Sequence, residues 1–128
     1  MPAPLKDEKS FQAAVGAQNL SVVHFEAEWA EQCAQVNEVL DALSAQKDYS
    51  SVKFYSCPAE EVSDVSLKYN IEAVPTVILF RSGQTVDRVN GADAARITET
   101  VRKHNATSQS EDGDDSLSLE DKLESTDK

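Results

Sequence analysis

The sequence predicts a single α/β domain built around a mixed β-sheet. Segments with helical and strand-like patterns alternate over residues 7–104, and the last two strand-like segments are separated by one short turn. Alternation favours parallel strands connected by helices, whereas a short turn makes its two strands antiparallel. We therefore expect a central sheet of four to five strands flanked by helices.

The chain is expected to open with a helix followed by a central strand. In residues 7–18 the apolar side chains recur at helical spacing, Asp7 is a suitable N-cap and Gly16 lies near the end. Residues 20–26 include β-branched Val22 and Val23 and aromatic Phe25, which are typical of a strand buried on both faces. We place this strand in the middle of the sheet.

The strongest helical pattern covers residues 31–46, where apolar and polar side chains separate onto opposite faces. The alternating segment 51–57 ends at Pro58, which predicts a strand that runs into a loop. A short helix is expected next, and its packing side chains would be Val65, Leu67 and Tyr69. The last expected elements are a hairpin of two strands and a closing helix, at 76–80, 85–89 and 92–104.

The charge balance argues against two classes of partner. The 128 residues contain 23 acidic and 12 basic side chains, for a formal net charge of −11. Nucleic acids and anionic membranes are bound through Lys and Arg, which neutralise phosphates, and the sequence has no basic block. No segment reaches the roughly 18 to 20 apolar residues of a transmembrane helix. We expect no nucleic acid and no membrane partner.

The two cysteines, Cys33 and Cys57, are too few for a disulfide-rich secreted scaffold. No Cys/His quartet is apparent that would hold a structural zinc ion, and the N-terminus lacks the apolar run of a secretory signal. A disulfide between the two would require Cα atoms within about 7 Å. In the reducing compartment that we expect, we favour two independent thiols.

The composition changes after His104. Residues 105–128 hold eight acidic and two basic side chains, a net charge of −6. Such a segment buries too little apolar surface to offset the entropy lost on ordering, so we expect a domain at 1–104 and a disordered acidic tail or interdomain linker at 105–128. The tail either docks a partner or only solvates the chain. Ser108 and Ser118, each with an acid three residues on, also suit an acidophilic kinase.

Several motifs in combination resemble the thioredoxin family. They are the run Trp29-Ala30-Glu31-Gln32-Cys33, the tripeptide Val74-Pro75-Thr76 and the glycines Gly83 and Gly91. Four features more narrowly resemble the N-terminal thioredoxin-like domain of multidomain monothiol glutaredoxins, the glutaredoxin-3 or PICOT family. They are His24, the run from Trp29 to Gln35, Asn37-Glu38-Val39 and the ending with Asp87-Arg88 and Gly91-Ala92. The match covers roughly residues 8–104 and implies the thioredoxin fold.

The resemblance implies a redox turn that has lost its attacking group. In thioredoxins an exposed thiolate attacks the substrate disulfide, and a second cysteine one helical turn deeper resolves the mixed disulfide. Here Ala30 occupies the attacking position and Cys33 the resolving position. Dithiol exchange at this turn is therefore not expected.

His24 stands where the family usually has a buried acid that assists proton transfer at the resolving cysteine, and Glu26 stands where a bulky aromatic is common. A histidine can also transfer protons near neutral pH. Because no nucleophile is present for it to serve, we favour a hydrogen-bonded core histidine without a catalytic role.

The resemblance also implies a groove for an extended peptide. Pro75 matches the family's cis-proline, and in active members the backbone before this proline pairs with the substrate. Such a groove can persist without the thiol. We expect Val74, Pro75 and Thr76 to form it, with Trp29 and Gln32 on the neighbouring turn. Trp29 is either a contact anchor or a residue that packs the turn.

We favour a redox-inactive, thioredoxin-like protein-binding module. In the family that it resembles, this module precedes glutaredoxin domains whose Cys-Gly-Phe-Ser motif and glutathione hold a bridging [2Fe-2S] cluster. The resemblance implies cytosolic iron–sulfur cluster assembly and iron homeostasis, BolA-type or kinase partners, and a cytoplasmic location that extends to the nucleus. The chain has no Cys-Gly-Phe-Ser motif. We therefore expect no metal and no cofactor unless glutaredoxin domains follow.

The alternative is a monothiol oxidoreductase or redox sensor that acts through Cys33. It requires a thiolate at neutral pH and an open path to the sulfur. The position of Cys33 disfavours it, because the residue belongs to the first turn of a helix and Ala30 partly covers it.

Overall fold

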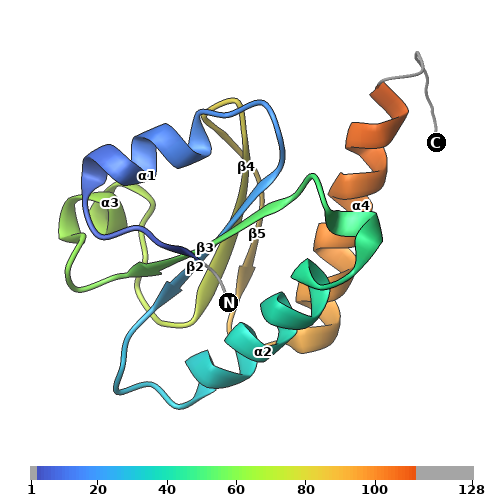
Figure 1. Cartoon of the computed structure of the whole chain (residues 1–128). Helices are drawn as coiled ribbons and strands as arrows, with labels where there is room; N and C mark the ends of the chain where they lie inside the picture. Colours follow the sequence, from blue (N-terminus) through green and yellow to red (C-terminus); the bar gives the residue numbers. More distant parts are fainter. Residues whose placement is uncertain (1–2, 112–128) are drawn as a thin grey trace.

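Five strands form one mixed sheet at the centre of the molecule (Figure 1). The structure, a computed structural model, describes residues 3–111. The spatial order is β1-β3-β2-β4-β5, in which β1, β3 and β2 are parallel and β4 is antiparallel to both β2 and β5. The strands are β1 Ala3–Pro4, β2 Ser21–Glu26, β3 Lys53–Pro58, β4 Thr76–Arg81 and β5 Gln84–Asn90.

Helices cover both faces of this sheet (Figure 1). Helices α1 and α3 lie on one face, and α2 and α4 lie on the other. A 3₁₀ turn, η1, follows α2. The elements are α1 Glu8–Val15, α2 Gln32–Ser44, η1 Lys47–Tyr49, α3 Ser63–Lys68 and α4 Ala94–Glu111. The predicted α/β architecture, a mixed sheet of four to five strands flanked by helices, is confirmed.

Strand β2 is central, as its composition indicated. It pairs with β3 on one side and with β4 on the other, so that His24 lies opposite both Ser56 and Val77. The first five residues of β2 are buried. Because successive side chains point to opposite faces, one strand supplies both layers of the core.

The core has two parts, one on each face of the sheet. Side chains of α2 and α4 pack with Val22 and Leu79 on one face. Phe11 of α1 and Val65 of α3 pack with Phe25 on the other face. Phe11 is fully buried and its ring contacts three other aromatic rings, those of Phe25, Tyr69 and Phe80.

Local signals set the ends of α1 and the hairpin. The Asp7 side chain accepts a hydrogen bond of 2.7 Å from the Ser10 backbone N–H, which confirms the predicted N-cap. The turn between β4 and β5 consists of Ser82 and Gly83, both with positive φ, as expected of a two-residue hairpin turn.

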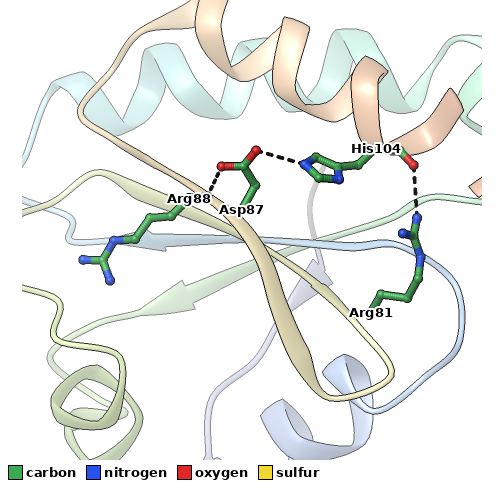
Figure 2. A network of polar contacts seen from close by, with 4 residues as sticks. All are labelled: Arg81, Asp87, Arg88 and His104. Carbon is green, nitrogen blue, oxygen red and sulfur yellow. Dashed lines mark hydrogen bonds and ion pairs between the residues drawn. The ribbon is translucent and has the colours of Figure 1, made fainter. Parts of the chain in front are cut away.

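A polar network joins β5 and β4 to α4 (Figure 2). His104 Nε2 lies 2.9 Å from Asp87 Oδ2, and the Arg81 guanidinium donates to the His104 carbonyl over 3.1 Å. The second Asp87 oxygen accepts a 2.8 Å hydrogen bond from the Arg88 backbone N–H. These bonds hold the C-terminal half of α4 against the hairpin.

Helix α4 continues to Glu111, so the predicted end at residue 104 falls inside a helix. The expectation of disorder from residue 105 is therefore wrong for 105–111. The reason is physical: adding a residue to an existing helix is far easier than starting one, and residues 105–111 contain neither Gly nor Pro. Asn105 is also buried and donates a 2.9 Å hydrogen bond to the Asp48 carbonyl. The rest of the predicted tail, with Ser118, lies outside the described residues.

Two other expectations need correction. Leu67 does not pack, because 79% of it is exposed, whereas Val65 on the same short helix is buried. The sequence pattern also missed β1, a two-residue strand that contains Pro4. Proline is tolerated there because β1 is an edge strand and needs fewer backbone donors.

Candidate functional site

The turn between β2 and α2 places Ala30 and Cys33 at the start of a helix. Ala30 donates its backbone N–H to the Ala27 carbonyl over 3.1 Å, and Cys33 donates to the Ala30 carbonyl over 3.1 Å. Helix α2 begins at Gln32, so Cys33 lies in its first turn, as predicted. Ala30 is 7% exposed and has no group that could attack a disulfide.

Cys33 is held as a protonated thiol. It is only 4% exposed, and burial raises its pKa, as does the negative charge of Glu26. A backbone hydrogen bond with Ala27 acts in the opposite direction but is weaker than the burial effect. The thiolate is the reactive form of cysteine, so this environment disfavours nucleophilic chemistry.

Cys57 is a second buried free thiol. It lies on β3 within the core part covered by α1 and α3, whereas Cys33 belongs to α2 on the other face (Figure 1). Burial, together with the charge of Glu26, raises the pKa of Cys57 to about 12. Both cysteines are free in the structure.

A chain of hydrogen bonds connects His24 to Glu26 through Asn37 of α2. The Asn37 amide nitrogen donates to Glu26 Oε1 over 3.2 Å, and Asn37 Oδ1 lies 3.0 Å from His24 Nδ1. Because this Asn37 oxygen can only accept, Nδ1 carries the hydrogen. Burial lowers the pKa of His24 and outweighs the opposing effects of Asn37 and Glu26, so the ring is neutral.

This tautomer leaves the lone pair of His24 on Nε2, which is buried and has no hydrogen-bond partner among the described residues. His24 is therefore a buried, hydrogen-bonded histidine, as favoured. A neutral ring with a free lone pair could accept a proton but has none to donate from Nε2. The link to Asn37 was not predicted, although Asn37 belongs to the motif that carries the resemblance.

The Val74–Pro75 peptide bond is cis, as the resemblance implied. Val74, Pro75 and Thr76 line a hollow of about 470 Å³. The Pro75 carbonyl accepts a 2.9 Å hydrogen bond from Gly91, and the Thr76 hydroxyl donates to the Ala73 carbonyl over 2.8 Å. These bonds fix the segment that the resemblance assigns to peptide binding.

Arg88 also lines this hollow and was missed as a site residue. Its guanidinium donates to the carbonyls of Tyr69 and Asn70, and its Nε lies 3.0 Å from Asn90 Oδ1. Arg88 thereby joins β5 to the loop after α3. The available signal was the Asp87-Arg88 pair, which predicts a strand but no contact.

Trp29 and Gln32 are not among the residues that line the Pro75 hollow. Trp29 is 69% exposed and lines a different hollow of about 640 Å³, together with acidic residues and Pro58. Gln32 is exposed at the first position of α2. A single groove that unites all five predicted residues therefore stays a prediction.

The described residues contain neither a cluster suited to a metal ion nor a helix suited to cross a membrane. Within 3–111, no three His, Cys, Asp or Glu side chains gather where they could hold a metal ion. Over the same part of the chain, no helix combines the length and apolar character needed to cross a membrane.

The sheet order, the cis-proline and the turn before α2 together define a domain of the thioredoxin class. Residues 3–103 match the Thioredoxin family, and the chain belongs to that family. It is also 32% identical over 101 residues to Thioredoxin-1 of Saccharomyces cerevisiae. The aligned region covers 79% of this chain and 96% of that protein. The crystal structure of thioredoxin from Malassezia sympodialis superimposes with a TM-score of 0.77 at 26% identity, over 82% of this chain and 91% of that one.

Within the family, the chain is similar to Glutaredoxin-3. It is 46% identical to Glutaredoxin-3 of Bos taurus over 88 residues, and these residues make up 69% of this chain. The match spans only 26% of the length of that relative. The likeness therefore concerns one thioredoxin domain.

Proposed function

We propose that this domain is a redox-inactive, protein-binding module of a glutaredoxin-3-like protein. One observation carries the proposal: Ala30 stands where a thioredoxin needs its attacking cysteine. A methyl group has no lone pair to attack sulfur, so the first step of dithiol exchange has no nucleophile.

The state of Cys33 supports the same conclusion. A thiol that is 4% exposed and whose pKa is raised has little thiolate and little access to a substrate disulfide. His24 could accept a proton at Nε2 in principle, but burial lowers the pKa of His24 and so makes the ring a poor base. The burial and the raised pKa of Cys33 both weigh against the monothiol alternative.

Without a redox activity, this domain would still be able to bind a peptide. The cis-proline segment borders a hollow of about 470 Å³ and is fixed by hydrogen bonds from both sides of the loop. An extended peptide that pairs with the backbone there would need no thiol. We propose Trp29, Gln32, Val74, Pro75 and Thr76 as the binding residues.

The wider role is proposed through the family resemblance. A glutaredoxin-3-like protein implies cytosolic iron–sulfur cluster assembly and iron homeostasis, with BolA-type or kinase partners and a cytoplasmic location that extends to the nucleus. The described residues gather no metal-binding set, so this domain would contribute binding while a glutaredoxin domain held the cluster with glutathione.

Insulin reduction with a thioredoxin reductase system tests the proposal. We expect the 128-residue chain to show no turnover above background and Cys33→Ser to behave identically. Turnover comparable to a dithiol thioredoxin, lost in Cys33→Ser, would support the monothiol enzyme instead.

A further inference from the structure

We propose that the hollow beside Trp29 docks an arginine-containing basic segment of a partner protein. The inference rests on the proposed function as a binding module and specifies the chemistry of one partner. The hollow beside Trp29 shares no lining residue with the hollow around Pro75.

The hollow has a volume of about 640 Å³ and lies where the turn after β2 faces the loop after β3. Pro58 and Pro4 contribute apolar surface, and the loop contributes Glu60 and Glu61. A concave surface with apolar and charged parts is suited to a side chain that has an apolar stem and a charged end.

Trp29 supplies an aromatic face at this hollow. Its side chain is 69% exposed, although a tryptophan is among the residues that gain most from burial. The face of an indole ring attracts cations, and Arg stacks on it more often than Lys. An exposed tryptophan is also the side chain most characteristic of binding hot spots.

The charge around Trp29 is strongly negative. Four glutamates line the hollow and Lys6 is the only basic residue among its described lining. Within residues 3–111, the side chains of Glu28, Glu60 and Glu61 form no ion pair, so their charges are available to a partner. An acidic segment would be repelled, whereas guanidinium groups would pair with these carboxylates.

A metal ion is a poorer occupant than a peptide. The glutamates of the hollow are too dispersed to form a coordinating set of three among the described residues. A segment that carries several arginines can reach separated carboxylates and still stack one guanidinium on Trp29.

Trp29 makes the test direct because it is the only tryptophan of the chain. The probe is the peptide Gly-Arg-Gly-Arg-Gly-Arg with blocked termini, titrated while Trp29 fluorescence is recorded. We expect a saturable change that weakens with salt, and no change with the matched glutamate peptide. Absence of any change with the arginine peptide would overturn the proposal.

Variants distinguish binding at the hollow from attraction by the overall negative charge of the protein. We expect Glu60→Gln/Glu61→Gln to weaken the arginine peptide about fivefold or more, and Lys6→Gln to strengthen it. The control is Glu38→Gln/Glu99→Gln, which removes the same charge from exposed helical positions and should change affinity far less. Equal weakening by both double variants would show that net charge alone attracts the peptide.

A titration with spermine tests whether the hollow binds any polycation equally well. If spermine quenches Trp29 with the same affinity as the peptide, the hollow is a general cation site and the proposal is wrong. Because binding of the arginine peptide requires no thiol chemistry, a negative peptide titration would leave the redox-inactive assignment in place. Positive insulin turnover would instead remove that assignment without affecting the titration.

Discussion

The ring of His24, on the central strand, is held by Asn37 of helix α2 through a contact of 3.0 Å between His24 Nδ1 and Asn37 Oδ1. Asn37 lies one helical turn after Cys33, so the bond fixes α2 against the sheet close to the redox turn. The second end of the Asn37 amide binds Glu26. One side chain thus satisfies two polar groups at the end of β2.

Loss of the Asn37 amide should destabilise the fold. In Asn37→Ala, His24 Nδ1 and the Glu26 carboxylate both lose a partner, and a buried group left without its hydrogen bond costs about 1–3 kcal/mol. Urea denaturation measures the change. Gln35→Ala, on the exposed face of the same helix, is the control and should stay within about 0.5 kcal/mol. Equal stability of the two variants would show that the chain of bonds contributes nothing.

The His24 ring should make the fold sensitive to mild acid. Burial lowers its pKa below the ordinary value of 6.5, so the unfolded state binds a proton first as pH falls. The stability contributed by the neutral ring is complete above pH 6.5 and is lost as pH falls from 6.5 towards the folded pKa.

The slope of unfolding free energy against pH checks this. His24→Gln removes the titrating group and should flatten the slope just below pH 6.5, whatever its effect on absolute stability. An unchanged slope would mean that His24 titrates alike in both states.

His104 should hold the Asp87 pKa down. The hydrogen bond from His104 is the main cause of the lowered Asp87 pKa, and the Arg88 backbone N–H contributes. In His104→Gln we expect the Asp87 pKa, read by carboxyl NMR, to rise towards 3.8. Because the pair is partly exposed, the cost in stability should be below about 1 kcal/mol.

The wild-type contribution of Asp87 is present above pH 3.8 and is lost as pH falls below that value, because the folded pKa is the lower one. Arg102→Gln, an exposed change on the same helix, is the control and should leave the Asp87 titration unmoved. A shift of equal size in the control would point to general charge effects.

Neither thiol should react readily in the folded chain. Cys33 and Cys57 are buried with raised pKa values, so iodoacetamide at pH 8 should modify both far more slowly than free cysteine. Intact mass measures the extent of modification, and both should react fully in denaturant. Rapid single modification at Cys33 in the folded protein would favour the monothiol alternative.

Most of the fold could be predicted because the chain's patterns agree with their surroundings. The apolar segment 20–26 is central because both faces of β2 are covered, and Asp7 caps α1 through a bond within one turn. Leu67, an apolar residue, is exposed, and Asn105, a polar residue, is buried, so the burial of each is the opposite of what its residue type suggests. Which face of a short helix is covered depends on the rest of the fold, and no local pattern records it.

The sequence predicted which residues belong to the site better than it predicted their contacts in space. Ala30, Cys33 and Pro75 were assigned from motifs, and the structure places Cys33 in the first turn of α2 and Pro75 after a cis bond. The contacts of Asn37 and Arg88 join segments far apart in the sequence, and spacing carries no information about them. For the same reason, only the structure shows that Trp29 and Pro75 line two different hollows.

Ala30→Cys tests the central claim most directly, because it restores the attacking group and changes nothing else. With Cys33 in place as the resolving thiol, we expect insulin reduction to rise from background to a clearly measurable rate, and Ala30→Cys/Cys33→Ser to lose the turnover. Circular dichroism confirms that each variant is folded. A folded Ala30→Cys variant that remains inactive would contradict the claim that the missing cysteine alone silences this domain.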